Sequence, residues 1–181
     1  MLESVEIYPN VWATAAILAY VTLQRVIELS IARRNTKRLL REGAFEVAAP
    51  QYSLLVALHA AWLGLIWLTA FGEPINLVLL GLFALVQLLR FWTLASIGRR
   101  WTTRIIVKPG ETLVTKGPYR FMAHPNYAVV VLEIFLLPAI FELYAIAILF
   151  SLLNAGALAI RIQAEQRALK KHTRGRKNLK L

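Results

Sequence analysis

Three groups of polar residues in the C-terminal half of the chain have types and spacings that suit chemistry. They are Gly117-Pro118-Tyr119, His124-Pro125-Asn126-Tyr127, and the pair Arg161 and Glu165. Pro125 lies where a helix can begin, because the N–H that proline lacks is not needed in the first turn. His124 and Tyr127 would then flank the first turn of that helix. Its free N–H groups and partial positive charge suit an anionic ligand group.

Arg161 and Glu165 are four residues apart, so they share one face of a helix. The forked guanidinium of Arg161 can hold a carboxylate through two hydrogen bonds. Each of these residues also has a simpler interpretation. Arg161 and Glu165 can form an ordinary ion pair, and His124 can be a helix-capping or interface histidine. Tyr119, Tyr127 and Trp101 can be aromatic anchors at the membrane interface.

Five apolar runs must position these residues, over 11–32, 52–71, 75–97, 127–141 and 143–160. A helix needs about 20 apolar residues, or at least ~17, to cross a bilayer. The first three runs meet this length, and the last two predict a tight helical hairpin. Only helices and closed barrels satisfy their backbone polar groups in lipid, and the short alternating segments of a barrel are absent. We therefore expect an all-α integral membrane protein with about five transmembrane helices.

Basic residues follow the first, third and fifth runs, and none precedes residue 11 or lies in the two remaining turns. This alternation predicts an N-terminus outside and a C-terminus in the cytoplasm of a multi-pass inner-membrane protein. Topology and attraction to anionic lipids account for the net charge of +11, so we expect no nucleic-acid partner.

The composition agrees with this class. Of the 181 residues, 58% are hydrophobic and 17% are charged, whereas soluble domains have about 45–50% and 25%. This argues against a soluble enzyme and against disorder. Without cysteine, the chain has no disulfide framework, zinc finger or thiol nucleophile. We expect one domain: a scaffold over 1–97, the site over 98–169, and a flexible, lipid-attracted basic tail over 170–181.

The polar groups and their order on two consecutive membrane helices resemble the isoprenylcysteine carboxyl methyltransferase (ICMT) family, over residues 98–169. Tyr119 precedes the His-Pro-x-Tyr motif by five residues, as in that family. The resemblance implies S-adenosyl-L-methionine (SAM) as the cofactor, bound from the cytosol, and no metal. By position, the implied SAM-binding residues are Glu111, Thr112, Leu113, Val114, Tyr119, His124, Pro125, Asn126, Tyr127 and Glu165.

The resemblance gives Arg161 and Glu165 catalytic roles and directs Arg161 toward the methyl acceptor. Arg104 falls at another cofactor contact, but with a different residue type. Gln166 stands where the family often has a second glutamate. The implied acceptor is lipophilic, with a prenyl or acyl tail and a carboxylate or hydroxyl head. A carboxylate needs no general base, whereas a phenol or enol would lose its proton to Glu165 or His124.

Family members methylate prenylated cysteine carboxylates or, in one bacterial branch, alkylpyrones, and the sequence leaves this choice open. Two further interpretations stay open: an NADPH-binding enzyme related to sterol reductases, and a non-enzymatic membrane module. Charges within the apolar runs often mark function. Here Arg25 with Glu28, and Arg90 with Glu133, can equally be structural pairs.

Overall fold

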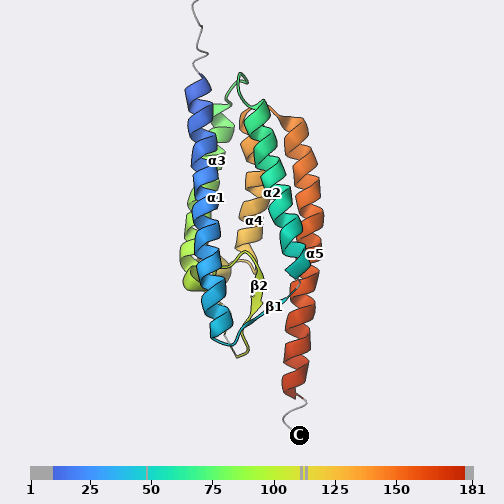
Figure 1. Ribbon diagram of the computed structural model, residues 1–181. Coiled ribbons are helices and arrows are strands. Elements are labelled where there is room, and N and C mark those ends of the chain that lie inside the picture. The colour runs from blue at the N-terminus through green and yellow to red at the C-terminus, as the bar shows by residue number, and fades with distance from the viewer. Residues whose placement is uncertain (1–9, 48, 111, 113, 178–181) are drawn as a thin grey trace, which may run out of the picture.

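The computed structural model describes residues 10–47, 49–110, 112 and 114–177. Its helices stand side by side in one bundle (Figure 1). The elements, in chain order, are α1 (Asn10–Arg41), β1 (Phe45–Val47), α2 (Ala49–Thr69), α3 (Leu77–Ile97), the 3-10 turn η1 (Gly98–Arg100), β2 (Ile105–Val107), the 3-10 turn η2 (Gly117–Arg120), α4 (Pro125–Ile140) and α5 (Tyr144–Lys177). Among the described residues, α1, α2, α3 and α5 are long and apolar enough to cross a membrane.

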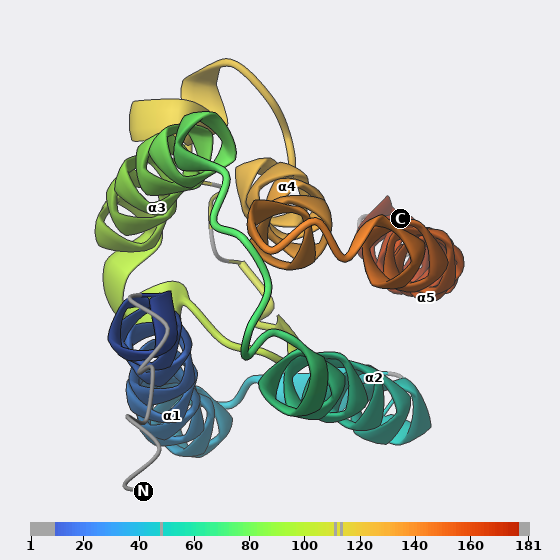
Figure 2. The same ribbon diagram turned by 90° about the horizontal axis from the view of Figure 1, so that it is seen from above.

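The remaining helix, α4, is shorter and more buried than these four. It has 16 residues, which at 1.5 Å per residue is about 24 Å, less than the ~30 Å hydrocarbon core of a bilayer. It packs between α3 and α5 (Figure 2). The turn into α5 contains Glu142, which has a positive φ of 58°. The tight hairpin of α4 and α5 is thus present, while the count of five spans and the orientation of the termini stay predictions.

Two sequence expectations about the fold need correction. The protein is not wholly helical, because β1 and β2 pair antiparallel, with Glu46 opposite Ile106. In addition, α5 continues to Lys177, so the segment 170–177, expected to be a flexible tail, is helical. Lysine, arginine and glutamine are good helix formers, so a helix need not end where its apolar run ends.

The apolar core occupies the half of the bundle away from β1 and β2. All five helices contribute large side chains to it: Leu18, Trp62, Ile66, Phe83, Ile134, Leu137, Phe141 and Phe150. At this end, the backbone N–H of Asn76 before α3 donates to the carbonyl of Ile140 at the end of α4, at 2.8 Å. The opposite half of the bundle is therefore the part free to hold a cavity.

A network of buried charges separates the two halves. Arg90 on α3 bonds Glu28 on α1, with Nε 2.6 Å from Oε1, and Glu133 on α4, with Nη1 2.7 Å from Oε2. Arg25 completes the network, with bonds of 3.3 Å to Glu28 and 2.7 Å to Glu133. Both expected pairs are present, and each arginine also bonds the other pair's acid. Two positive and two negative charges thus join α1, α3 and α4 without net charge.

Candidate functional site

A cavity of about 320 Å³ lies on the sheet side of this charge network. Apolar side chains of α1 and α2 line much of it, including Val26, Leu29, Leu55 and Leu63. Arg25, Glu28 and Arg90 of the network form one part of its wall. Further polar or aromatic residues line it near the end of the bundle that carries β1 and β2, among them Trp101, Thr103, Asn126, Tyr127 and Arg161. The cavity is therefore lined by apolar side chains between two polar parts: the charge network, which has no net charge, and the end that contains Arg161.

Arg161 is a buried cation at this polar end. Its residue is 8% exposed. Its Nε donates to the hydroxyl of Tyr127 at 3.0 Å, and its guanidinium carbon lies 5.9 Å from the centre of that ring. Within the described part of the chain, no carboxylate pairs with Arg161, and its two terminal nitrogens make no hydrogen bond. Glu165 lies four residues further along α5, but its side chain is outside the described part. Arg161 is thus placed to bind an anion in the cavity.

The start of α4 supplies the second polar feature. His124 is the N-cap residue, and its side chain makes no capping hydrogen bond. Its ring instead stacks on Tyr127, with centroids 5.0 Å apart and planes at 12°. The side-chain oxygen Oδ1 of Asn126 is buried and has no hydrogen-bond partner among the described side chains and backbone groups. A helix start with an uncapped first turn and an unpaired buried amide oxygen suits a polar ligand.

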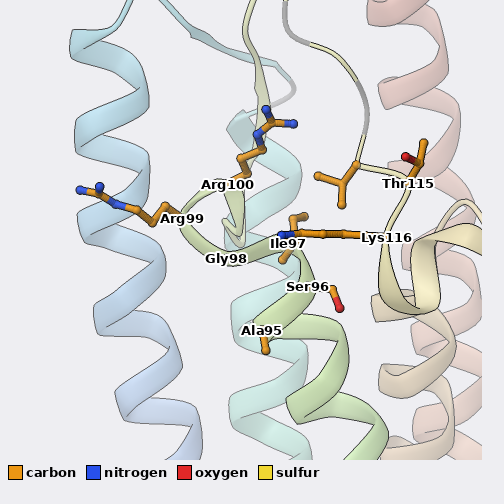
Figure 3. Close-up of a pocket in the computed structure, with 9 residues that line it drawn as sticks. Ala95, Ser96, Ile97, Gly98, Arg99, Arg100, Thr115 and Lys116 are labelled. Atoms are coloured by element: carbon orange, nitrogen blue, oxygen red, sulfur yellow. The ribbon is translucent and has the colours of Figure 1, made fainter.

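A second cavity, of about 470 Å³, lies beside the end of α3 (Figure 3). It is lined by Ala95, Ser96, Ile97, Gly98, Arg99, Arg100, Val114, Thr115 and Lys116. In Figure 3, Lys116 extends across it toward Ile97, whereas Arg99 points away toward α1. Arg100 donates from Nη1 to the carbonyl of Thr112 at 2.7 Å, which ties the loop to η1.

The residues implied to bind SAM do not all meet in one cavity. Asn126 and Tyr127 line the first cavity with Arg161, while Val114 lines the second. The others lie as follows: His124 stacks on Tyr127, Pro125 is buried as the first residue of α4, Tyr119 belongs to η2, and the Thr112 carbonyl binds Arg100. Glu111, Leu113 and the side chain of Glu165 lie outside the described residues.

Arg104, which the family resemblance placed at a cofactor contact, binds protein side chains in the structure. Its Nη1 lies 2.7 and 2.9 Å from the two carboxylate oxygens of Glu46, and its guanidinium lies 4.5 Å from the centre of the Tyr52 ring. Nearby, the Lys108 ammonium bonds Glu42 and holds the pKa of that carboxyl below its ordinary value. These pairs join the loop around β2 to the ends of α1 and α2.

Gly117 explains how η2 lies against α3. Its φ is +58°, and a Cβ at this position would lie 2.0 Å from Oγ of Ser96. Only glycine combines a positive φ with this close approach. The glycine of the Gly117-Pro118-Tyr119 group thus allows η2, and with it Tyr119, to lie directly on α3.

Other residues that line the first cavity were not predicted from the sequence. An aromatic anchor at the membrane interface was one interpretation of Trp101, but the residue is buried in the cavity wall. Tyr52, Thr103 and His59 were not singled out, and they also line this cavity. No local pattern marks them, because they come from separate parts of the chain that only the fold brings together. In the sequence, the charged residues Glu28 and Arg90 within apolar runs were the signal that could have indicated a polar wall of this cavity.

The fold and the site together define a multi-pass membrane protein with a polar site at one end of an apolar cavity. The sequence profile of the "Isoprenylcysteine carboxyl methyltransferase (ICMT) family" matches residues 77–171. The chain is 38% identical over 166 residues to "Uncharacterized protein YpbQ" of Bacillus subtilis (strain 168), a match that covers 87% of this chain and 96% of that relative. No solved structure matches significantly. The chain belongs to the ICMT family, and this membership indicates a membrane methyltransferase.

Proposed function

We propose that this protein transfers a methyl group from SAM to a carboxylate or hydroxyl oxygen of a lipophilic acceptor. The observation that carries the proposal is the position of Arg161. Its guanidinium is buried at the polar end of an apolar cavity, and no described acid pairs with it. Burying an unpaired charge is costly. A cavity of this kind therefore favours an acceptor with an anionic head and an apolar tail.

The lining of the cavity supports a lipid-soluble acceptor. Val26 on α1 and Val56 on α2 both line it, yet they are 57% and 40% exposed. The cavity thus reaches the outer surface between α1 and α2, and in a membrane this surface meets lipid. A prenyl or acyl tail would lie along these helices, with its head at Arg161.

The described residues at the start of α4 fit the polar parts of SAM. Asn126 has a buried oxygen without a described partner, and His124 leaves the first helical turn uncapped. Tyr127 contacts both His124 and Arg161. These residues would hold the cofactor, together with Glu111, Thr112, Leu113, Val114, Tyr119, Pro125 and Glu165. When bound, SAM supplies an electrophilic methyl group on a sulfonium.

The protein's own contribution is positioning and exclusion of water. Arg161 would hold a carboxylate by two of its N–H groups and keep it ionised, so no base is needed. For a hydroxyl acceptor, Glu165 or His124 would remove the proton. We further propose that the site faces the cytoplasm of the cell membrane, as the distribution of basic residues predicts.

The test is transfer of labelled methyl from SAM into a lipid extract by the full-length protein in detergent. We expect transfer by the wild type and a loss of at least about 100-fold in Arg161→Gln, because the buried group that binds the acceptor loses its charge. SAM binding should remain within a few-fold. Full activity in Arg161→Gln would contradict the proposed role of Arg161. Transfer of hydride from NADPH instead of methyl from SAM would favour the reductase interpretation.

A further inference from the structure

Trp101 is held in the wall of the first cavity by its backbone. Its N–H donates to the carbonyl of Gly98 at 3.0 Å. Its carbonyl accepts from the buried side chain of Asn35 on α1, at 2.8 Å. The backbone that carries the indole is therefore fixed from both sides, by η1 and by α1.

The indole N–H of Trp101 has no hydrogen-bond partner in the part of the chain that the structure describes. The residue is 6% exposed and lines the cavity that Arg161 and Tyr127 also line. Its Nε1 is buried and makes no hydrogen bond to any described residue. A buried indole N–H normally finds an acceptor, because leaving it unpaired costs free energy.

The other tryptophans show that this is a particular feature of Trp101. Trp62 donates to the carbonyl of Ile134 at 3.2 Å, and Trp67 donates to the hydroxyl of Thr22 at 3.0 Å. Trp12 and Trp92 are exposed and need no protein partner. Of the five tryptophans in the chain, Trp101 is thus the buried one whose N–H lacks an acceptor among the described residues.

We infer that Trp101 determines acceptor specificity by donating its indole N–H to the head of the acceptor, beside the oxygen held by Arg161. This inference rests on the proposed function of the cavity. Two donors from different elements, an indole N–H and a guanidinium, match a planar head with two acceptor oxygens. A carboxylate offers each donor its own charged oxygen, whereas the two donors would have to share the single neutral oxygen of an alcohol. Trp101 therefore selects for the two-oxygen head over an alcohol of the same chain length.

The test uses palmitic acid and 1-hexadecanol, which share a 16-carbon chain, as probes of the full-length protein in detergent. Titrations compare the wild type with Trp101→Phe, and Trp12→Phe serves as the control that removes an exposed indole. We expect about tenfold weaker palmitate binding in Trp101→Phe, the effect of losing one hydrogen bond to a charged group. Hexadecanol binding should change less than about twofold, and Trp12→Phe should match the wild type.

A second measurement guards against instability of the Trp101→Phe variant. Nitrogen-15 labelling of the wild-type tryptophans lets each indole N–H be followed by NMR as palmitate is added. The Trp101 proton should move downfield, and the Trp12 proton should not. The inference is overturned if the Trp101 proton does not respond, if Trp101→Phe binds palmitate as the wild type does, or if both probes weaken equally. SAM titration is a separate experiment, so failure here is distinguishable from failure of the proposed function.

Discussion

Arg161 and Tyr127 form the smallest unit of the proposed site. The bond from Nε of Arg161 to the Tyr127 hydroxyl fixes one edge of the guanidinium, at 3.0 Å, and leaves the terminal nitrogens for a ligand. The Tyr127 ring also stacks on His124. One tyrosine thus connects the arginine that faces the acceptor with the helix start proposed to hold the cofactor.

Substitution of Tyr127 by phenylalanine should separate these two roles. Tyr127→Phe keeps the ring that stacks on His124 but removes the hydroxyl that accepts from Arg161. We expect kcat/KM for methyl transfer to fall about tenfold, because a hydrogen bond to a charged group is lost. SAM affinity should stay within a few-fold. Tyr144→Phe, at an exposed position, is the control, and an unchanged kcat/KM in Tyr127→Phe would show that the hydroxyl does not position Arg161.

At the level of elements, the approach of η2 to α3 depends on one glycine. Gly117→Ala places a Cβ 2.0 Å from Ser96 Oγ and 2.8 Å from Ser96 Cβ, at a φ of +58°. We expect a loss of about 1–3 kcal/mol in the free energy of unfolding, from overpacking and backbone strain. Chemical denaturation in detergent measures this loss.

The control for this prediction is Gly156→Ala on α5, where a Cβ meets nothing within 4 Å and φ is not positive. It should be neutral or slightly stabilising, since alanine favours helix over glycine. The double variant Gly117→Ala/Ser96→Gly should recover part of the lost stability, because the clashing side chain is gone. Equal stabilities of Gly117→Ala and Gly156→Ala would contradict this account of η2.

The helices were predictable from the sequence because their apolar runs are long. The run 52–71 corresponds to α2, and the run 75–97 to α3. The sheet was not predictable, since β1 and β2 have three residues each and pair across about 60 positions of sequence. The same holds for the site. The groups around Tyr127 and Arg161 stand out as motifs, whereas Trp101 becomes informative only when its unpaired N–H is seen.

At the scale of the whole molecule, hydrogen bonds and ion pairs between helices hold the bundle together, as burial of apolar side chains does in a water-soluble protein. Lipid tails are as apolar as leucine, so interhelical hydrogen bonds and close packing must hold a membrane bundle together. Gln24 on α1 donates to Gln87 on α3 at 2.9 Å, and Gln87 donates to Glu133 on α4, also at 2.9 Å. These bonds extend the neutral charge network and fix α1, one wall of the cavity, against α3 and α4.

Glu133→Gln should destabilise the molecule strongly. Glu133 is fully buried and bonds Arg25, Arg90 and Gln87. The substitution leaves the buried Arg90 and the partly buried Arg25 with one acid. We expect a loss of about 3–5 kcal/mol, as for other broken buried ion pairs. Unfolding in detergent checks the value.

The matched variant Glu133→Gln/Arg90→Gln removes one charge of each sign and restores neutrality. It should be more stable than Glu133→Gln alone. If Glu133→Gln cost less than about 1 kcal/mol, the network would not be what holds these helices together.

The most direct test of the central claim is calorimetric titration of SAM, with NADPH as the comparison, into the full-length protein purified in detergent. The account predicts saturable binding of SAM, no binding of NADPH, and SAM affinity at least about tenfold weaker in His124→Ala, because a group at the start of α4 is lost. Binding of NADPH without binding of SAM, in the presence and in the absence of a lipid extract, would contradict it.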